Sequence, residues 1–267
     1  MTDAFLSFAV AAGAIILRSV SFCGIKWLNK PVGLSPFEIL YLRSAISFPF
    51  LLLFHSLRPA DPKNSVWKIS RTQMPFVLTR VIGSTIANTI QQYALKYLSS
   101  SKSLLLMENP FIPGLMAWFL AGEAITGRET FIYAMVTAGL YCISYKEGAM
   151  QKPAPESLDK DLSYEIIGIA LTCVASGVQA VGIIAMRKLK TANEIVDPVV
   201  IVIFISIASL ILNSGFLLVF DKHPVMYTQD IINLLILISL TGTAGMVLSS
   251  QLYYYFKASW SVVILNL

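Results

Sequence analysis

The chain contains a series of apolar segments, each about as long as a bilayer is thick, and the later segments repeat the earlier ones. Five of them lie within residues 1–145, and the others lie within 163–267. A transmembrane helix needs about 20 apolar residues, at about 1.5 Å each, to cross roughly 30 Å of hydrocarbon. Charged residues make up 13% of the chain, against roughly 25% in soluble domains, and mean hydropathy is +0.70. We therefore predict an all-α polytopic membrane helix bundle.

Eight complete spans are predicted, followed by a partial ninth that begins at Trp260. The stretches cover residues 5–27, 36–56, 74–95, 99–121, 129–145, 164–185, 197–220 and 231–254. Residues 146–162 contain Pro153, Pro155 and seven charged residues, so we interpret them as a linker. The linker separates a first domain, 1–145, from a second, 163–267.

The second domain repeats the first at several points. The matching residues are Arg18 with Gln179, Ile25 with Met186, Ser35-Pro36 with Asp197-Pro198, and Gln92 with Gln251. Because five spans is an odd number, the second copy begins on the opposite side of the membrane and runs inverted. Inverted repeats are typical of secondary transporters, in which two related halves expose a central site to each side in turn. We therefore predict an inverted repeat of five plus five spans.

The second copy stops before it has replayed the whole of the first. Its last residue, Leu267, corresponds to Glu108 of the first copy. About 37 more residues would complete the second copy if the copies were equal in length. We therefore expect that this sequence is truncated at its C-terminus. Basic loop residues are nearly balanced between the two sides, and the cluster from Arg58 to Arg71 leans only weakly toward a cytosolic N-terminus.

Short motifs occur in a fixed order over a stretch of about 120 residues in the first half of the chain. They are Lys26, Ser35-Pro36-Phe37-Glu38 with Arg43, Arg80-Val81-Ile82-Gly83, Tyr97-Leu98-Ser99-Ser100-Ser101, Pro110, Gly122-Glu123-Ala124-Ile125-Thr126 and Gly139. This series resembles the EamA-type repeat of the drug/metabolite transporter superfamily, and within it the solute carrier 35 group, especially its G-type members. The resemblance covers the first half well and the second half loosely. It implies a ten-helix carrier of organic metabolites with both termini in the cytosol.

Charged side chains within the spans suggest a binding site, because each costs about 2.5–3.5 kcal/mol at mid-helix on insertion scales. The set is Arg18, Glu38, Arg43, Arg80 and Glu108. We hypothesise that Arg18 and Arg80 bind an anionic solute, while Glu108 pairs with one of them or accepts a proton. An ion-paired structural network in the bundle core is the alternative. Glu38 and Arg43 lie near the start of one span, and we interpret them as a structural ion pair.

Polar amides in the spans are further candidates for substrate binding. They are Asn88, Gln92, Gln179 and Gln251. Gln92 and Gln251 occupy equivalent places in the two copies, and so do Arg18 and Gln179, as expected if both halves line one pseudo-symmetric cavity. Hydrogen bonding between helices, at about 0.6 kcal/mol per contact, is the alternative explanation.

The sequence lacks the patterns of an enzyme. His55 and His223 are the two histidines, both at or beyond predicted membrane edges, and no H-E-x-x-H, G-x-S-x-G or P-loop motif occurs. The three cysteines lie in separate apolar segments without metal-ligand spacing. We expect no catalysis, no cofactor and no metal. The Lys and Arg residues are spread over many loops, so we expect no nucleic-acid partner either.

Together these features predict a multi-pass integral membrane transporter of small organic metabolites that works by alternating access. Anionic or nucleotide-sugar-like solutes are candidate substrates. A non-transporting membrane subunit or regulator on the same scaffold is the alternative. The expected partners are a small-molecule solute and the lipid bilayer, with a homodimer as a candidate assembly. The substrate, the coupling ion and the membrane in which the protein resides are not encoded in these patterns.

Overall fold

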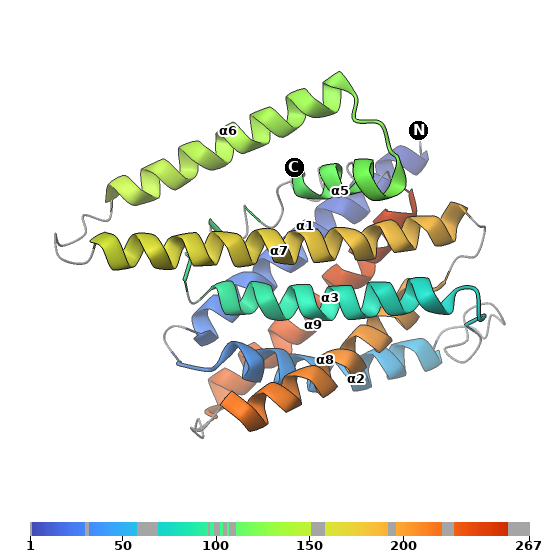
Figure 1. The fold of residues 1–267 in the computed structure, drawn as a ribbon. Helices are drawn as coiled ribbons and strands as arrows, with labels where there is room; N and C mark the ends of the chain where they lie inside the picture. Colours follow the sequence, from blue (N-terminus) through green and yellow to red (C-terminus); the bar gives the residue numbers. More distant parts are fainter. Residues whose placement is uncertain are drawn as a thin grey trace.

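The computed structural model describes residues 2–29, 32–57, 69–95, 97–98, 102–103, 106, 111–150, 158–191, 196–220 and 227–255. The extended regular structure within these residues is helical, and Figure 1 shows most of the helices packed against one another. The helices are α1 (Thr2–Asn29), α2 (Pro36–Leu57), α3 (Met74–Ala94), α5 (Phe111–Ala121), α6 (Gly127–Met150), α7 (Leu158–Thr191), α8 (Pro198–Phe220) and α9 (Gln229–Tyr255). The predicted all-α fold is confirmed.

Four helices are long and apolar enough to cross a membrane by length and composition. They lie in α2, α7, α8 and α9, over Pro36–Ser56, Tyr164–Leu189, Pro198–Val219 and Gln229–Gln251. Helix α3 has 21 residues and is long enough, but its polar residues, among them Arg80, Asn88 and Gln92, lower its hydropathy. A helix that is polar on one face needs protein or water on that face instead of lipid.

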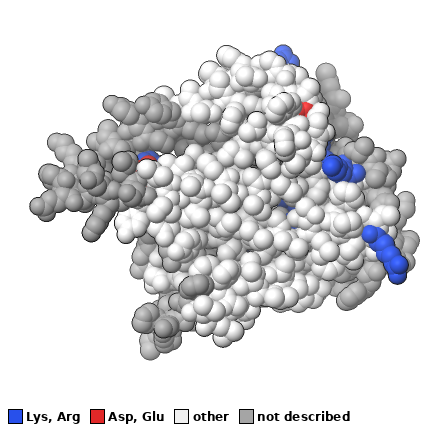
Figure 2. Space-filling model, in the orientation of Figure 1, with Lys and Arg blue, Asp and Glu red and all other residues white. Residues whose placement is uncertain are grey.

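The outer surface of the bundle is suited to a bilayer. Figure 2 shows one face on which few charged side chains are visible, most of them toward one edge. Large apolar side chains such as Phe119, Leu57 and Leu218 are strongly exposed, at 76%, 76% and 88%. Exposed apolar surface on this scale is costly in water and favourable against lipid tails.

The predicted span 99–121 contains a short helix in the structure. Helix α5 has 11 residues, and at about 1.5 Å per residue it is roughly 16 Å long, which is half of the hydrocarbon thickness. The predicted candidate Glu108 and the neighbouring Pro110 lie outside the described residues.

The segment predicted as a linker, residues 146–162, lies between α6 and α7 and overlaps both helices. Helix α6 continues to Met150, and α7 begins at Leu158, so both ends of the predicted linker are helical. Lys and Glu are good helix formers, and their charges are solvated once a helix has left the membrane. Hydropathy marks where a helix leaves the lipid, and the helix itself ends later.

The helices pair across the two halves of the chain in a symmetric pattern. Helix α1 packs along α9, α3 packs along α7, and α2 packs against α8. In the predicted repeat, α1, α2 and α3 correspond to α7, α8 and α9. The α1–α9 contact is then the counterpart of the α7–α3 contact, and the α2–α8 contact is its own counterpart. A two-fold axis between repeated halves produces this pattern.

Two buried apolar clusters lie at opposite ends of the bundle. The α1–α9 cluster consists of Ile25, Leu28, Leu34, Ile39, Leu95, Ile231, Leu235 and Ile238. The α3–α7 cluster consists of Val77, Val81, Met186, Leu189, Val196, Val200, Ile201 and Ile205. Val77 and Leu95 mark the two ends of α3 and are roughly 27 Å apart along it at about 1.5 Å per residue. The two clusters therefore lie near opposite faces of the membrane.

The two clusters are built from equivalent residues of the repeat. The pairs are Ile25 with Met186, Leu28 with Leu189, Leu34 with Val196, and Ile39 with Ile201. Equivalent stretches of the two copies thus form the two clusters. The stretch from the first half lies in the α1–α9 cluster, and the stretch from the second half lies in the α3–α7 cluster.

A row of aromatic rings joins the two halves on the side of the α1–α9 cluster. Ring centroids are 4.9 Å apart for Phe37 and Phe216, 6.1 Å for Phe37 and Tyr93, 5.6 Å for Tyr93 and Tyr97, and 5.9 Å for Tyr97 and Tyr164. Phe216 and Tyr164 come from the second half, so the row crosses between the halves twice.

Candidate functional site

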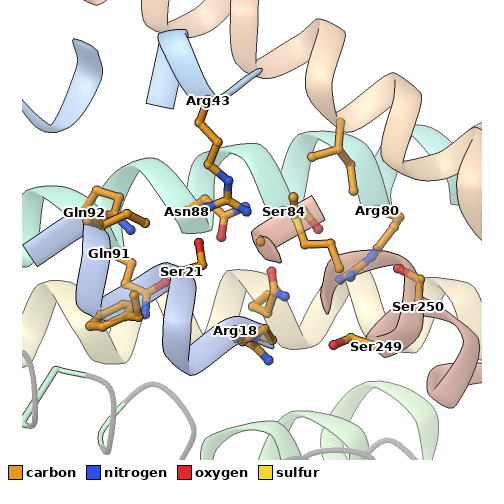
Figure 3. Close-up of a pocket in the computed structure, with 16 residues that line it drawn as sticks. Arg18, Ser21, Arg43, Arg80, Ser84, Asn88, Gln91, Gln92, Ser249 and Ser250 are labelled. Carbon is orange, nitrogen blue, oxygen red and sulfur yellow. The ribbon is translucent and has the colours of Figure 1, made fainter. Parts of the chain in front are cut away.

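A polar cavity lies between the two apolar clusters, in the middle of the bundle (Figure 3). Its lining residues are Arg18, Ser21, Phe22, Ile25, Arg43, Arg80, Ser84, Asn88, Gln91, Gln92, Gln179, Ile205, Gly242, Met246, Ser249 and Ser250. They come from α1, α2, α3, α7, α8 and α9. Ile25 belongs also to the α1–α9 cluster and Ile205 to the α3–α7 cluster, so each end of the cavity adjoins an apolar cluster.

Helix α3 supplies the largest polar share of this lining. Arg80, Ser84, Asn88 and Gln91 follow one another at intervals of three or four residues, which places them along one face of the helix. The α3 hydroxyls of Thr85 and Thr89 instead donate to backbone carbonyls one turn earlier, at 2.8 and 2.9 Å. The polar character of α3 is therefore concentrated on the face toward the cavity.

Three guanidinium groups reach the cavity from three different helices, and each lies over a glycine of the second half. A Cβ placed on Gly242 would lie 2.7 Å from Nη2 of Arg43, and a Cβ on Gly245 would lie 2.9 Å from Cγ of Arg18. A Cβ on Gly182 would lie 3.3 Å from Cδ of Arg80. Figure 3 shows Arg43, Arg18 and Arg80 around the same space. The bare glycine backbone makes room for each long side chain.

Several buried oxygens on the cavity wall have no hydrogen-bond partner in the described part of the chain. They are Ser84 Oγ, Gln92 Oε1, Gln179 Oε1 and Ser250 Oγ. Buried polar atoms in proteins are nearly always satisfied by protein groups or by ordered water. The cavity has a volume of about 70 Å³, which is room for about five water molecules. Water or the polar groups of a solute would satisfy these oxygens.

Five of the predicted site residues meet in this cavity. They are Arg18, Arg80, Asn88, Gln92 and Gln179. Gln251 does not line it, although its neighbours Ser249 and Ser250 do. Glu108 lies outside the described residues.

The sequence of the first half of the chain also assigns the protein to a family. The model of the EamA-like transporter family matches residues 6–145. The chain belongs to the EamA-like transporter family. Members of this family are membrane transporters of small solutes, and the chain is an integral, multi-pass membrane protein.

The fold as a whole is also found in solved structures. One of them, described as "Crystal structure of protein", matches with a TM-score of 0.67 at 15% sequence identity. The match covers 97% of this chain and 85% of that one. At this identity the likeness concerns the fold alone. No curated protein matches the chain.

Arg43 is the site residue that the sequence analysis assigned to another role. It was predicted to pair with Glu38, but within the described structure no ion pair joins them. Glu38 accepts a hydrogen bond from the hydroxyl of Tyr227, and its backbone N–H donates to Ser35 Oγ at 3.1 Å. Side chains five residues apart on a helix point to different sides, whereas those three or four apart are neighbours. That spacing was the signal that could have placed Arg43 elsewhere.

Proposed function

We propose that this EamA-like protein moves a small organic anion across its membrane by alternating access, with the polar cavity as the solute site. The observation that carries the proposal is the pair of repeat-related apolar clusters. They adjoin the two ends of the cavity and are made from equivalent residues, such as Leu28 and Leu189. Two equivalent closures on either side of one site are what alternating access requires.

The chemistry of the lining supports an anionic solute. Three arginines line the cavity, and its lining in the described structure contains no carboxylate. Guanidinium groups hydrogen-bond carboxylate and phosphate in a planar, bidentate geometry. Glu108 remains a proposed partner of one arginine or a proton acceptor in the cycle.

The volume of the cavity favours a compact solute. Room for about five water molecules accommodates a carboxylate or phosphate with a short carbon skeleton, and is small for a whole nucleotide sugar in this conformation. Membership of the G-type solute carrier 35 group and a homodimeric assembly stay proposals. We propose further that the protein is not an enzyme.

Uptake by the full chain in proteoliposomes tests the function. Radiolabelled succinate, phosphate and a mixture of neutral amino acids are supplied outside, and Arg18→Gln is compared with the unaltered protein. Arg71→Gln is the matched control, because Arg71 is exposed and lies before α3. We expect flux of an anion, lost in Arg18→Gln and retained in Arg71→Gln. Absence of flux for every solute refutes transport, and normal flux through Arg18→Gln refutes the site.

A further inference from the structure

Arg43 stands at the junction of two cavities. A second, smaller cavity of about 20 Å³ lies between α2 and α8 and shares Arg43 and Asn88 with the main one. Four of its lining side chains are hydroxyls: Ser44, Ser47, Ser206 and Ser209. Figure 3 shows Arg43 reaching from α2 toward Asn88 on α3. A group bound at Arg43 is therefore next to both cavities.

The charge of Arg43 has no counter-ion in the described structure. No hydrogen bond or ion pair to its guanidinium occurs there, and no described carboxylate lines either cavity. The positive charge of Arg18 acts on it and repels it. A cation inside a membrane protein is costly unless an anion pairs with it. A bound anion would supply the counter-charge that the described residues around Arg43 lack.

Gly242 makes room for the guanidinium of Arg43 beside Ser21. A Cβ at this position would lie 2.6 Å from Ser21 Oγ and 2.9 Å from Cζ of Arg43, closer than real Cβ contacts. The hydroxyl of Ser21 donates to the carbonyl of Ile238 at 3.2 Å, so it is fixed on the α9 side of the cavity. The guanidinium of Arg43, the hydroxyl of Ser21 and the backbone of Gly242 thus meet where α1, α2 and α9 converge.

We propose that Arg43 is the principal oxyanion-binding side chain of this protein, seated over Gly242, and that the transported solute presents a carboxylate or a phosphate to it. The inference rests on the proposed transport function and adds the residue that selects the charge. A carboxylate and a phosphate share the chemistry that Arg43 recognises, two or more oxygens able to accept from one guanidinium.

Binding of small anions to the purified full chain tests this inference. The probes are inorganic phosphate, succinate and dimethyl succinate, which is uncharged and matches the carbon skeleton of succinate. Thermal unfolding is measured at constant ionic strength, balanced with sodium chloride. A bound probe raises the midpoint temperature of unfolding because it binds the folded protein only. We expect phosphate or succinate to raise it and dimethyl succinate to leave it unchanged; which of the two acts identifies the oxyanion.

Three variants locate the binding. Arg43→Gln should weaken binding of the active probe at least tenfold, and Arg43→Lys, which keeps the charge without the planar fork, should weaken it less. Gly242→Ala keeps Arg43 but displaces its guanidinium, so we expect a loss of three- to tenfold. The control Arg71→Gln should bind within twofold of the unaltered protein. If Arg43→Gln fails to fold, Gly242→Ala and Arg43→Lys still decide the question.

Two results would overturn the inference. One is an unaltered protein whose midpoint responds to neither phosphate nor succinate, and the other is an Arg43→Gln variant that binds like the unaltered protein. An uptake assay distinguishes this failure from failure of the transport function. If the unaltered protein and Arg43→Gln take up an uncharged solute at equal rates, transport is supported and the oxyanion site is refuted.

Discussion

The two halves of the chain contribute similar backbones and different chemistry to the cavity. The first half supplies all three arginines. The residues equivalent to them in the second half, by the register of the matching segments, are neutral: Gln179 for Arg18, Ile205 for Arg43 and Ser239 for Arg80. The second half supplies the glycines over which the arginines lie. The helix pairs and apolar clusters have kept the symmetry of the repeat, whereas the site has lost it.

This difference separates two requirements on one scaffold. The proposed closure of the cavity at two faces in turn would require equivalent contacts. The two clusters would supply them, because they consist of aliphatic side chains of similar size in both copies. Selecting a solute requires a particular charge in one place, which a symmetric pair of sites would only duplicate. A fourth cation opposite the first three would raise repulsion without adding selectivity.

The largest effect is expected when the second half is made to resemble the first at Ile205. Ile205→Arg puts a further cation beside Arg43 and into the α3–α7 cluster, where an unpaired charge is costly. We expect a loss of about 3 kcal/mol or more in the free energy of unfolding, measured by thermal unfolding in detergent. Ile205→Met, similar in volume and uncharged, is the control. Unchanged stability would mean that the charge asymmetry of the halves has no structural basis.

Moving a charge between the halves tests whether its place matters. In the double variant Arg18→Gln with Gln179→Arg, the total charge of the cavity is unchanged. The residue equivalent to Gly245 in the first half is Ile86, so the moved arginine lacks a glycine to lie over. We expect anion uptake about tenfold below the unaltered protein, a loss of about 1.4 kcal/mol, and above that of Arg18→Gln alone. Full activity in the double variant would show that only total charge counts.

Equivalent positions in the two clusters should respond oppositely to solute. Leu28→Cys and Leu189→Cys are made separately after Cys23, Cys142 and Cys173 are replaced by alanine, and each is labelled with a membrane-impermeant maleimide from either side. When solute on one side shifts the conformational equilibrium, one position should label a few-fold faster and the other a few-fold slower. Parallel changes at both positions would contradict alternating closure.

The last comparison concerns two glycines on the packing surfaces. A Cβ on Gly83 would lie 3.2 Å from the carbonyl oxygen of Val178, so Gly83→Ala should push α3 from α7 and destabilise the protein by about 1–3 kcal/mol. Gly215 on α8 has open space around its Cβ position, so Gly215→Ala should be stabilising by about 0.5–1 kcal/mol, through helix propensity alone. Equal midpoints for the two variants would argue against close packing of the halves.

The helices and five of the residues that line the cavity could be predicted because a bilayer imposes simple rules. A stretch of about 20 apolar residues indicates a span, and a charge or amide inside it indicates a site. Those rules found Arg18, Arg80, Asn88, Gln92 and Gln179. They misassigned Arg43, since nearness in sequence to Glu38 suggested a pair that helix geometry does not allow.

Other features depend on how the helices are rotated, which a repeat alignment does not give. Gln251 matches Gln92 in sequence, yet the wall of the cavity is formed by its neighbours Ser249 and Ser250. The place of Gly242 and Gly245 beneath Arg43 and Arg18 required the structure.

In the proposed alternating-access cycle, the aromatic row makes the free energy of opening different on the two sides of the membrane. On its side of the membrane, opening separates Phe37 from Phe216 and Tyr97 from Tyr164. Two ring pairs at about 0.5–1.5 kcal/mol each would favour the state closed on that side by about 5- to 150-fold. Without solute, the protein would therefore mostly adopt the conformation in which its site is open to the other compartment. The same solute would then half-saturate uptake at different concentrations on the two sides.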